Sequence, residues 1–290
     1  MRWVRHHWLR VVALLALTAL LVAFGRHVDW RAAATAIRSA DTRLLVLALV
    51  ANQLSLGLKA VRWWVFLRPL GVRSLSLVVR ATFAGASLNN LVVAQGGEAA
   101  RVLIVSRATG VSAKRVTGAL ALERVLDVVS YLTLLVAATW MLELPDMLVR
   151  WRTAASVALA IIAILLVWLA SPARLSVAML LSLGAWGLQV TTYHAVAVAA
   201  HLPLPLSGSI AALLAIGISF LIRATPGNIG VFQLIYAMTV RGFGIAEGPA
   251  VAAALLIQTI QVLPTIVVGT LMTHGLLRRR ALAACPSDVP

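Results

Sequence analysis

The sequence predicts an all-α, polytopic integral membrane protein. Of its 290 residues, 61% are hydrophobic and 12% are charged, whereas a soluble domain carries about 25% charged residues. Mean hydropathy is +0.96. Six apolar runs have about the length that a helix needs to cross a bilayer, which gives about six full spans. These runs cover residues 11–24, 43–58, 116–142, 153–170, 175–200 and 249–272.

The first apolar run follows a short basic segment. Arg2, Arg5 and Arg10 precede it, as in a signal peptide, but no small-residue cleavage site comes directly after it. We therefore expect an uncleaved first span over residues 11–25. Residues 26–42 then form an external segment that contains a short surface helix.

Basic residues between the apolar runs predict the topology. Lys and Arg are enriched on the cytoplasmic side of membrane proteins. The assignment that places most of the 25 basic residues there has both termini in the cytoplasm, and we expect the chain in the cytoplasmic (inner) membrane. Residues 1–280 form a single transmembrane domain and residues 281–290 a polar tail. Because the net charge of +16 is spread between apolar runs, we do not expect nucleic acid as a partner.

Two hydrophobic segments are interrupted. Residues 74–110 contain two asparagines and then the break at Gly96-Gly97, and residues 207–245 contain the break Pro226-Gly227-Asn228 and Gly230. Irregular backbone at membrane depth has to be buried in protein or to face a watery cavity. Each segment therefore either enters and leaves on one side, as in transporters with inverted halves, or forms two ordinary short spans, which would raise the count to eight.

Charged residues occur deep inside one predicted span. In the span 114–142, Glu123 lies roughly 13 Å from the helix start, with Arg124 and Asp127 beside it. An ionised group at this depth costs about 2.5–3.5 kcal/mol and needs a partner or water. Arg101 is one candidate partner. Two interpretations remain open: a buried ion-pair cluster that joins helices, or a hydrophilic groove for a lipid headgroup.

Other candidate site residues flank the two breaks. Glu98 lies in the first turn of a helix that begins after the glycine pair, where the helix dipole favours a carboxylate, and Arg101 is placed to pair with it at i+3. The same geometry suits a phosphate. Arg223, just before the second break, either meets a phosphate or extends toward the outer surface.

Enzyme and metal motifs are absent from the sequence. We find no metalloprotease helix motif, phosphate-binding loop or nucleophile elbow, and the histidines do not cluster. The single cysteine, Cys285, excludes an intramolecular disulfide. We therefore expect no catalytic residue, metal or cofactor.

Four motifs together resemble a known family. They are AVRWWVFL from Ala60, GGEAARVLIVSR from Gly96, ALERVLDVVSYLTLL from Ala121 and TPGNIGVFQ from Thr225. Their order is similar to that in the lysylphosphatidylglycerol synthase transmembrane-region family, over about residues 43–280. The resemblance implies a flippase-like domain that handles lipids, without the soluble aminoacyltransferase domain to which it is fused in other members. The chain departs from the family pattern at Asn228 and Gln233, where glycine and glutamate are common.

The leading hypothesis from the sequence is a lipid flippase or transporter. Its partner is a membrane lipid, either a phospholipid or an isoprenoid-linked lipid, and its groove is lined by Glu98, Arg101, Glu123, Arg124 and Asp127. An alternative is a non-transporting partner of a lipid-modifying enzyme or of a glycosyltransferase that makes envelope polysaccharide. A third is an intramembrane transferase.

Overall fold

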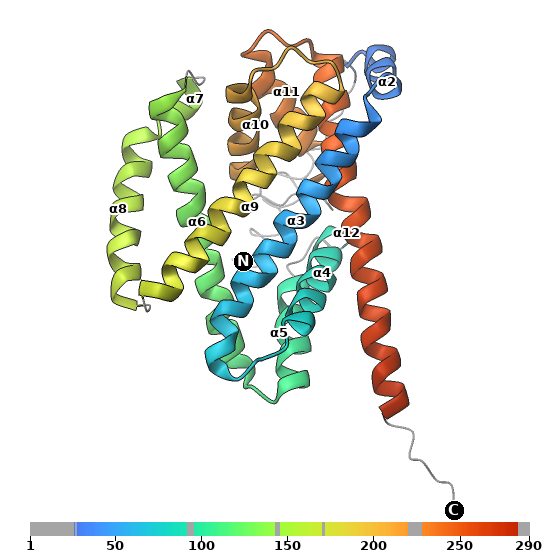
Figure 1. Cartoon of the computed structure of the whole chain (residues 1–290). Helices are drawn as coiled ribbons and strands as arrows, with labels where there is room; N and C mark the ends of the chain where they lie inside the picture. Colours follow the sequence, from blue (N-terminus) through green and yellow to red (C-terminus); the bar gives the residue numbers. More distant parts are fainter. Residues whose placement is uncertain are drawn as a thin grey trace, which may run out of the picture.

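The structure is helical throughout its described part. The computed structural model describes Arg26 and residues 28–91, 96–142, 146–169, 172–219 and 228–283, and these ranges contain no strand (Figure 1). The predicted all-α membrane fold is therefore confirmed. The predicted first span, Arg223, Pro226, Gly227 and most of the C-terminal tail lie outside the described residues.

Long helices make up the frame of the molecule. Among the described residues, three helices are long and apolar enough to cross a membrane: α3, α9 and α12. Helices α3 and α9 pack along each other, while α6 and α8 lie beside each other at the edge of the molecule (Figure 1). The bounds are α3 Thr42–Leu67, α6 Ala113–Met141, α7 Asp146–Val149, α8 Arg152–Leu169, α9 Pro172–Ala199 and α12 Glu247–Ala283.

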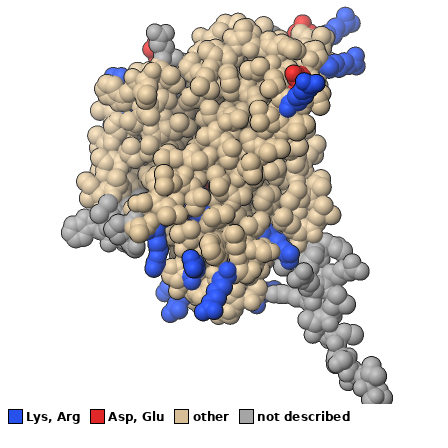
Figure 2. All heavy atoms as spheres, viewed as in Figure 1, with Lys and Arg blue, Asp and Glu red and all other residues tan. Residues whose placement is uncertain are grey.

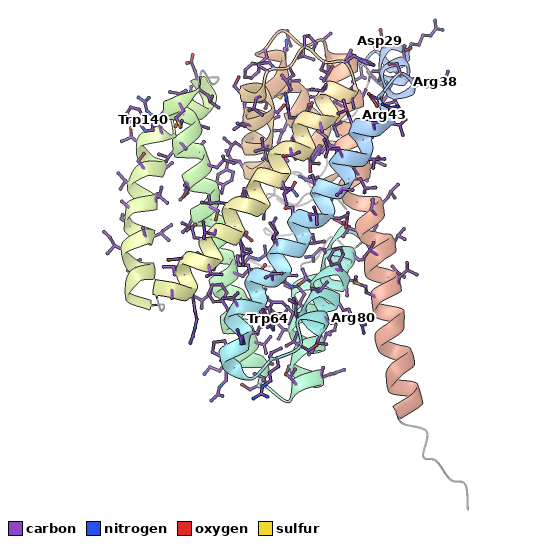
Figure 3. The ribbon with its side chains drawn as sticks, in the orientation of Figure 1. Asp29, Arg38, Arg43, Trp64, Arg80 and Trp140 are labelled. Atoms are coloured by element: carbon purple, nitrogen blue, oxygen red, sulfur yellow. The ribbon has the colours of Figure 1, made fainter. Side chains whose placement is uncertain are left out.

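An apolar band separates two charged ends. In Figure 2, Lys and Arg side chains gather at two ends of the visible face, and the surface between them is free of charge. Trp64 and Trp140 lie toward opposite ends (Figure 3), where amphipathic rings suit the membrane–water boundary. The guanidinium of Arg152 lies 4.1 Å from the centroid of the Trp140 ring. Large apolar side chains are exposed on several helices of the band, among them Val50, Leu54, Ile161, Leu165, Leu180, Leu263 and Leu271.

A short helix, α2 (Trp30–Arg38), precedes the first described span. Asp29 caps it by accepting hydrogen bonds from the backbone N–H groups of the first turn, each at 3.0 Å. The helix packs on the start of α12, where a Cβ at Gly248 would lie 2.9 Å from the carbonyl oxygen of Asp29. The capping carboxylate and this close contact hold α2 at the end of the bundle (Figure 1).

The described part of each interrupted segment contains two short helices. The first contains α4 (Leu75–Leu91) and α5 (Gly96–Thr109), and the second contains α10 (Leu206–Ser219) and α11 (Val231–Arg241). Their lengths, between about 16 and 26 Å at 1.5 Å per residue, fall short of a 30 Å hydrocarbon layer. The two pairs occupy opposite halves of the bundle (Figure 1). Both observations favour re-entrant segments over additional full spans.

The first pair owes its close packing to two glycines, Gly97 on α5 and Gly85 on α4, where a Cβ would lie 2.6 Å from the carbonyl oxygen of Gly97. The backbone N–H of Gly97 donates to Oδ1 of Asn89 at 2.9 Å, so α4 caps the start of α5. A Cβ at Gly97 would collide with the carbonyl oxygen of Gly85 and with the Asn89 side chain. At Gly96 the nearest atom to such a Cβ is Cδ2 of Leu88, at 3.8 Å. Gly97 is therefore required for the contact between helices, and Gly96 is not.

Left-handed backbone precedes the second short helix of the other pair. Gly230 has φ of 87° and Asn228 has φ of 59°. Asparagine is, after glycine, among the residues that adopt this conformation most readily, which explains why it can occupy a position where the resembled family has glycine. Gln233 lies in the first turn of α11, and its Oε1 accepts a hydrogen bond from the Gly230 N–H at 2.7 Å.

The buried apolar residues form separate cores in the two halves. One core lies among α9–α12 and includes Tyr193, Phe232 and Tyr236, whose rings are in tilted contact. Another lies among α3–α6 and includes Trp63 and Val116. Polar residues concentrate between these two cores, and they form the candidate site.

Candidate functional site

Six charged residues meet where α3, α5 and α6 converge. We call them the charged cluster: Arg62, Glu98, Arg101, Glu123, Arg124 and Asp127. The structure thus brings together all five charged residues that the sequence predicted for this region. It adds Arg62, which lies in the span before them and which the sequence analysis had not singled out.

Arg62 is the centre of the buried half of the cluster. Its side chain is fully buried. Nη1 donates to Oγ of Ser182 on α9 at 2.7 Å, and Nη2 donates to Oδ1 of Asp127 at 2.8 Å. The same Nη2 lies 3.4 Å from Oε1 of Glu123. One guanidinium therefore joins α3, α6 and α9.

Glu123 is held by a second guanidinium. Nη2 of Arg101 on α5 donates to Oε2 of Glu123 at 2.7 Å, and the glutamate side chain is only 3% exposed. The Arg101 guanidinium also lies 4.2 Å from the ring centroid of Trp63, a cation–π contact. The predicted pairing of Arg101 with this cluster is present. The alternative pair with Glu98, on its own helix, is not formed, because Arg101 points to Glu123 instead.

The other half of the cluster is open. Arg124 forms ion pairs with Glu98 on α5 and with Asp127, the latter at 3.4 Å. The exposed fractions of these side chains are 44% for Arg124, 27% for Glu98 and 20% for Asp127. Exposed ion pairs are worth about 0–1 kcal/mol, so these can exchange partners at little cost. The buried half is an ion-pair cluster that joins helices, as one interpretation of the sequence expected, while the hydrophilic groove for a lipid headgroup stays a prediction.

Arg62 is buried inside the bundle, although its place in the sequence suggested a position at the membrane surface. Its place near the end of a span, among Lys59 and Arg68, is typical of a basic residue at the cytoplasmic surface of a membrane protein. Instead it is buried, because the three carboxylates Glu98, Glu123 and Asp127 need more positive charge than Arg101 and Arg124 supply. That charge imbalance was visible in the sequence, but the helix pairing that satisfies it was not.

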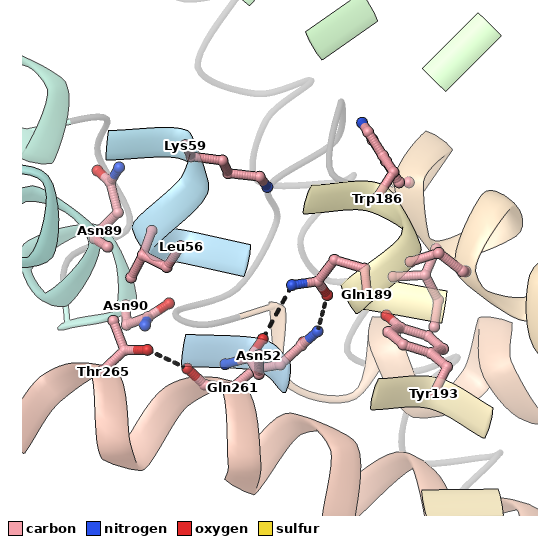
Figure 4. A pocket seen from close by; sticks show the side chains of 14 residues that line it. Asn52, Leu56, Lys59, Asn89, Asn90, Trp186, Gln189, Tyr193, Gln261 and Thr265 are labelled. Carbon is pink, nitrogen blue, oxygen red and sulfur yellow. Dashed lines mark hydrogen bonds between the residues drawn. The ribbon is translucent and has the colours of Figure 1, made fainter. Parts of the chain in front are cut away.

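A cavity lies next to the cluster, halfway along the spanning helices. Its volume is about 310 Å³, and α3, α4, α9, α10 and α12 line it. Asn52 on α3 lies about 15 Å from the start of its helix, and Lys59 lies about 12 Å from the end. Figure 4 shows the lining side chains, most of which are polar amides, aromatic rings or hydroxyls.

A chain of amides crosses one wall of this cavity. Nε2 of Gln189 donates to Oδ1 of Asn52, and Nε2 of Gln261 donates to Oε1 of Gln189, each at 3.1 Å (Figure 4). Thr265 donates to the backbone carbonyl of Gln261 at 2.7 Å. Helices α3, α9 and α12 are joined by this chain. Uncharged polar groups in so apolar a protein are costly unless they bond to one another or to a ligand.

Three donors at the cavity form no hydrogen bond or ion pair with the described residues. Lys59 forms no ion pair there, and its Nζ lies 5.9 Å from the ring centroid of Trp186. The indole N–H of Trp186 is buried without an acceptor. Asn90 forms no side-chain hydrogen bond. In the sequence, Asn90 marked an interruption of an apolar run, whereas Lys59 and the glutamines of α9 and α12 did not stand out as site residues.

The described residues contain no group of three or more His, Cys, Asp or Glu side chains that could hold a metal. The three carboxylates of the charged cluster are each bound to arginine. What this geometry can do is bind a polar or charged group within a membrane-embedded bundle.

Comparison with known proteins agrees with this geometry. No curated protein sequence matches the chain. A family model described as the lysylphosphatidylglycerol synthase TM region matches residues 10–171 and 165–269, which include the charged cluster and the cavity. The chain therefore belongs to the lysylphosphatidylglycerol synthase transmembrane-region family.

Proposed function

We propose that this chain is a lipid flippase, which moves a phospholipid or related polar lipid between the leaflets of a bacterial inner membrane. The observation that carries the proposal is a cavity with amide, hydroxyl and lysine side chains halfway along the spanning helices, lined by one helix of each short pair, α4 and α10. Family membership supports a role in lipid metabolism or transport. A headgroup would occupy the cavity, and its acyl chains would stay beside the apolar outer face.

The open edge of the charged cluster suits the first contact with a headgroup. Arg124 is bound to Glu98 by an exposed pair, so a lipid phosphate can replace the carboxylate with little loss. The fully buried Arg62 cannot exchange in this way, since breaking a buried ion pair costs about 3–5 kcal/mol. In this proposal Arg124 receives the headgroup and Arg62 holds the helices in place.

The proposed topology has both termini in the cytoplasm. It puts α4 and α5 in the cytoplasmic half of the membrane and α10 and α11 in the outer half. The basic residues Lys114 and Arg115, near the start of α6, favour this orientation.

Reconstitution into liposomes tests the proposal. Acyl-labelled phospholipid should become accessible from both leaflets faster in liposomes that contain the protein than in empty ones. Arg124→Ala should slow this exchange, while Arg115→Ala, at an exposed arginine outside the cluster, should not. A chain that only assists a lipid-modifying or glycosyltransferase enzyme would move no lipid in this assay. Equal rates for wild type and Arg124→Ala would contradict the proposed role of the charged edge.

A further inference from the structure

The balance of free donors and free acceptors indicates the charge of the headgroup. The cavity offers the Lys59 ammonium, the Trp186 indole N–H and the Asn90 amide, none of which forms a hydrogen bond or ion pair with the described residues. An ammonium and an indole N–H can donate hydrogen bonds but cannot accept them. A ligand that satisfies them must therefore present acceptors, and an anion satisfies the lysine best.

No free carboxylate is available beside the cavity for a cationic headgroup. Glu123 is bound by two arginines, Asp127 by Arg62 and Arg124, and Glu98 by Arg124. Lys59 and three arginines face three carboxylates in this region, so the described residues leave an excess of one positive charge. A second ammonium group entering the cavity would meet Lys59 without a carboxylate to offset the repulsion.

The amide wall fits an uncharged polar group. Asn52, Gln189 and Gln261 carry both donors and acceptors, and a hydroxyl group can bond to either. A volume of about 310 Å³ is at the lower end of the range for small-molecule sites, so it suits a headgroup and not a whole lipid.

We propose that the cavity binds a lipid headgroup that combines a phosphate diester with hydroxyl groups, as in phosphatidylglycerol, and disfavours headgroups with an added ammonium, such as an aminoacylated one. Lys59 binds the phosphate, with Asn90 and Trp186 as further donors, and the amide chain binds the hydroxyls. This inference rests on the proposed lipid transport and names its substrate class.

Two lysine variants and a matched control test the assignment. Lys59→Gln removes the charge and keeps a polar side chain of similar reach, whereas Lys59→Arg keeps the charge. Lys114→Gln is the control, since Lys114 is exposed at the start of α6. Purified variants are first compared by thermal unfolding, so that a folding defect is recognised. Retention of phosphatidylglycerol and of lysylphosphatidylglycerol is then measured by native mass spectrometry.

We expect Lys59→Gln to weaken retention of phosphatidylglycerol by about tenfold or more, which equals at least about 1.4 kcal/mol. Lys59→Arg should retain most of the binding, and Lys114→Gln should match wild type. Wild type should bind phosphatidylglycerol more tightly than its lysyl derivative. Soluble glycerol phosphate, added as competitor, should displace the lipid if the headgroup alone is recognised. If it does not compete, the acyl chains contribute part of the binding, and lipid retention should still depend on Lys59.

Equal or tighter binding of the lysyl lipid, or normal phosphatidylglycerol binding by Lys59→Gln, would overturn the assignment. The liposome assay separates this failure from failure of the proposed function. If the lysyl lipid crosses and phosphatidylglycerol does not, transport stands and the substrate class is wrong. If neither lipid crosses while Lys59-dependent retention persists, the binding site stands and the transport function is wrong.

Discussion

Replacing Arg62 by methionine should destabilise the protein far more than the same change at Arg124. Arg62→Met removes the 2.7 Å bond to Ser182, the 2.8 Å bond to Asp127 and the 3.4 Å contact with Glu123, all within a buried site. Breaking a buried ion pair costs about 3–5 kcal/mol. Because Glu123 keeps Arg101 and Asp127 keeps Arg124, we expect the lower end, about 3 kcal/mol.

That loss converts to a measurable shift. At about 2–4 °C per kcal/mol, Tm should fall by roughly 6–12 °C. Arg124→Met, which breaks exposed pairs, should lower Tm by less than about 4 °C. Thermal unfolding of the detergent-solubilised protein, followed by tryptophan fluorescence, measures both. Adding Asp127→Asn to Arg62→Met should cost less than the two single changes summed, because the pair is already broken. Equal Tm values for Arg62→Met and Arg124→Met would refute the buried role of Arg62.

Two further predictions concern the helix breaks. Gly97→Ala should lower Tm by several degrees, because its Cβ collides with α4 at a cost of about 1–3 kcal/mol. Gly96→Ala should leave Tm unchanged, and equal effects of the two changes would contradict the close helix contact. Asn228→Val should destabilise more than Asn228→Gly, since a β-branched residue at φ of 59° costs about 1–3 kcal/mol and glycine carries no such strain. The same unfolding assay measures both pairs, and a more stable valine variant would exclude the left-handed conformation.

The sequence was sufficient for the parts of the fold that follow from length and hydropathy. Apolar runs predicted the helices α3, α6, α8, α9 and α12, of which α3, α9 and α12 are long and apolar enough to cross a membrane, and the break at Gly96-Gly97 predicted separate short helices. These predictions succeed because span length and backbone breaks are local properties. The depth of Glu123 likewise follows from counting residues along one helix.

What the sequence could not supply is the pairing of distant helices. Arg62 looked like a topological charge near the end of its span, because nothing local shows that α3 packs against α6 and α9 at that residue. The cavity was missed for the same reason: Asn52, Gln189 and Gln261 are single polar residues in three separate apolar runs. Each alone is compatible with ordinary packing, and only their juxtaposition forms a polar wall.

The central claim is that lipid crosses through the cavity, and filling the cavity tests it most directly. Ala86 on α4 lines the cavity, so Ala86→Phe would occupy part of its 310 Å³, whereas Ala154→Phe adds the same ring at an exposed position on α8. Exchange of acyl-labelled phosphatidylglycerol between leaflets is measured for both variants in liposomes, after thermal unfolding confirms that both are folded. The account predicts that Ala86→Phe slows exchange toward the rate of empty liposomes and that Ala154→Phe keeps the wild-type rate. Unchanged exchange by folded Ala86→Phe would contradict a path through this cavity.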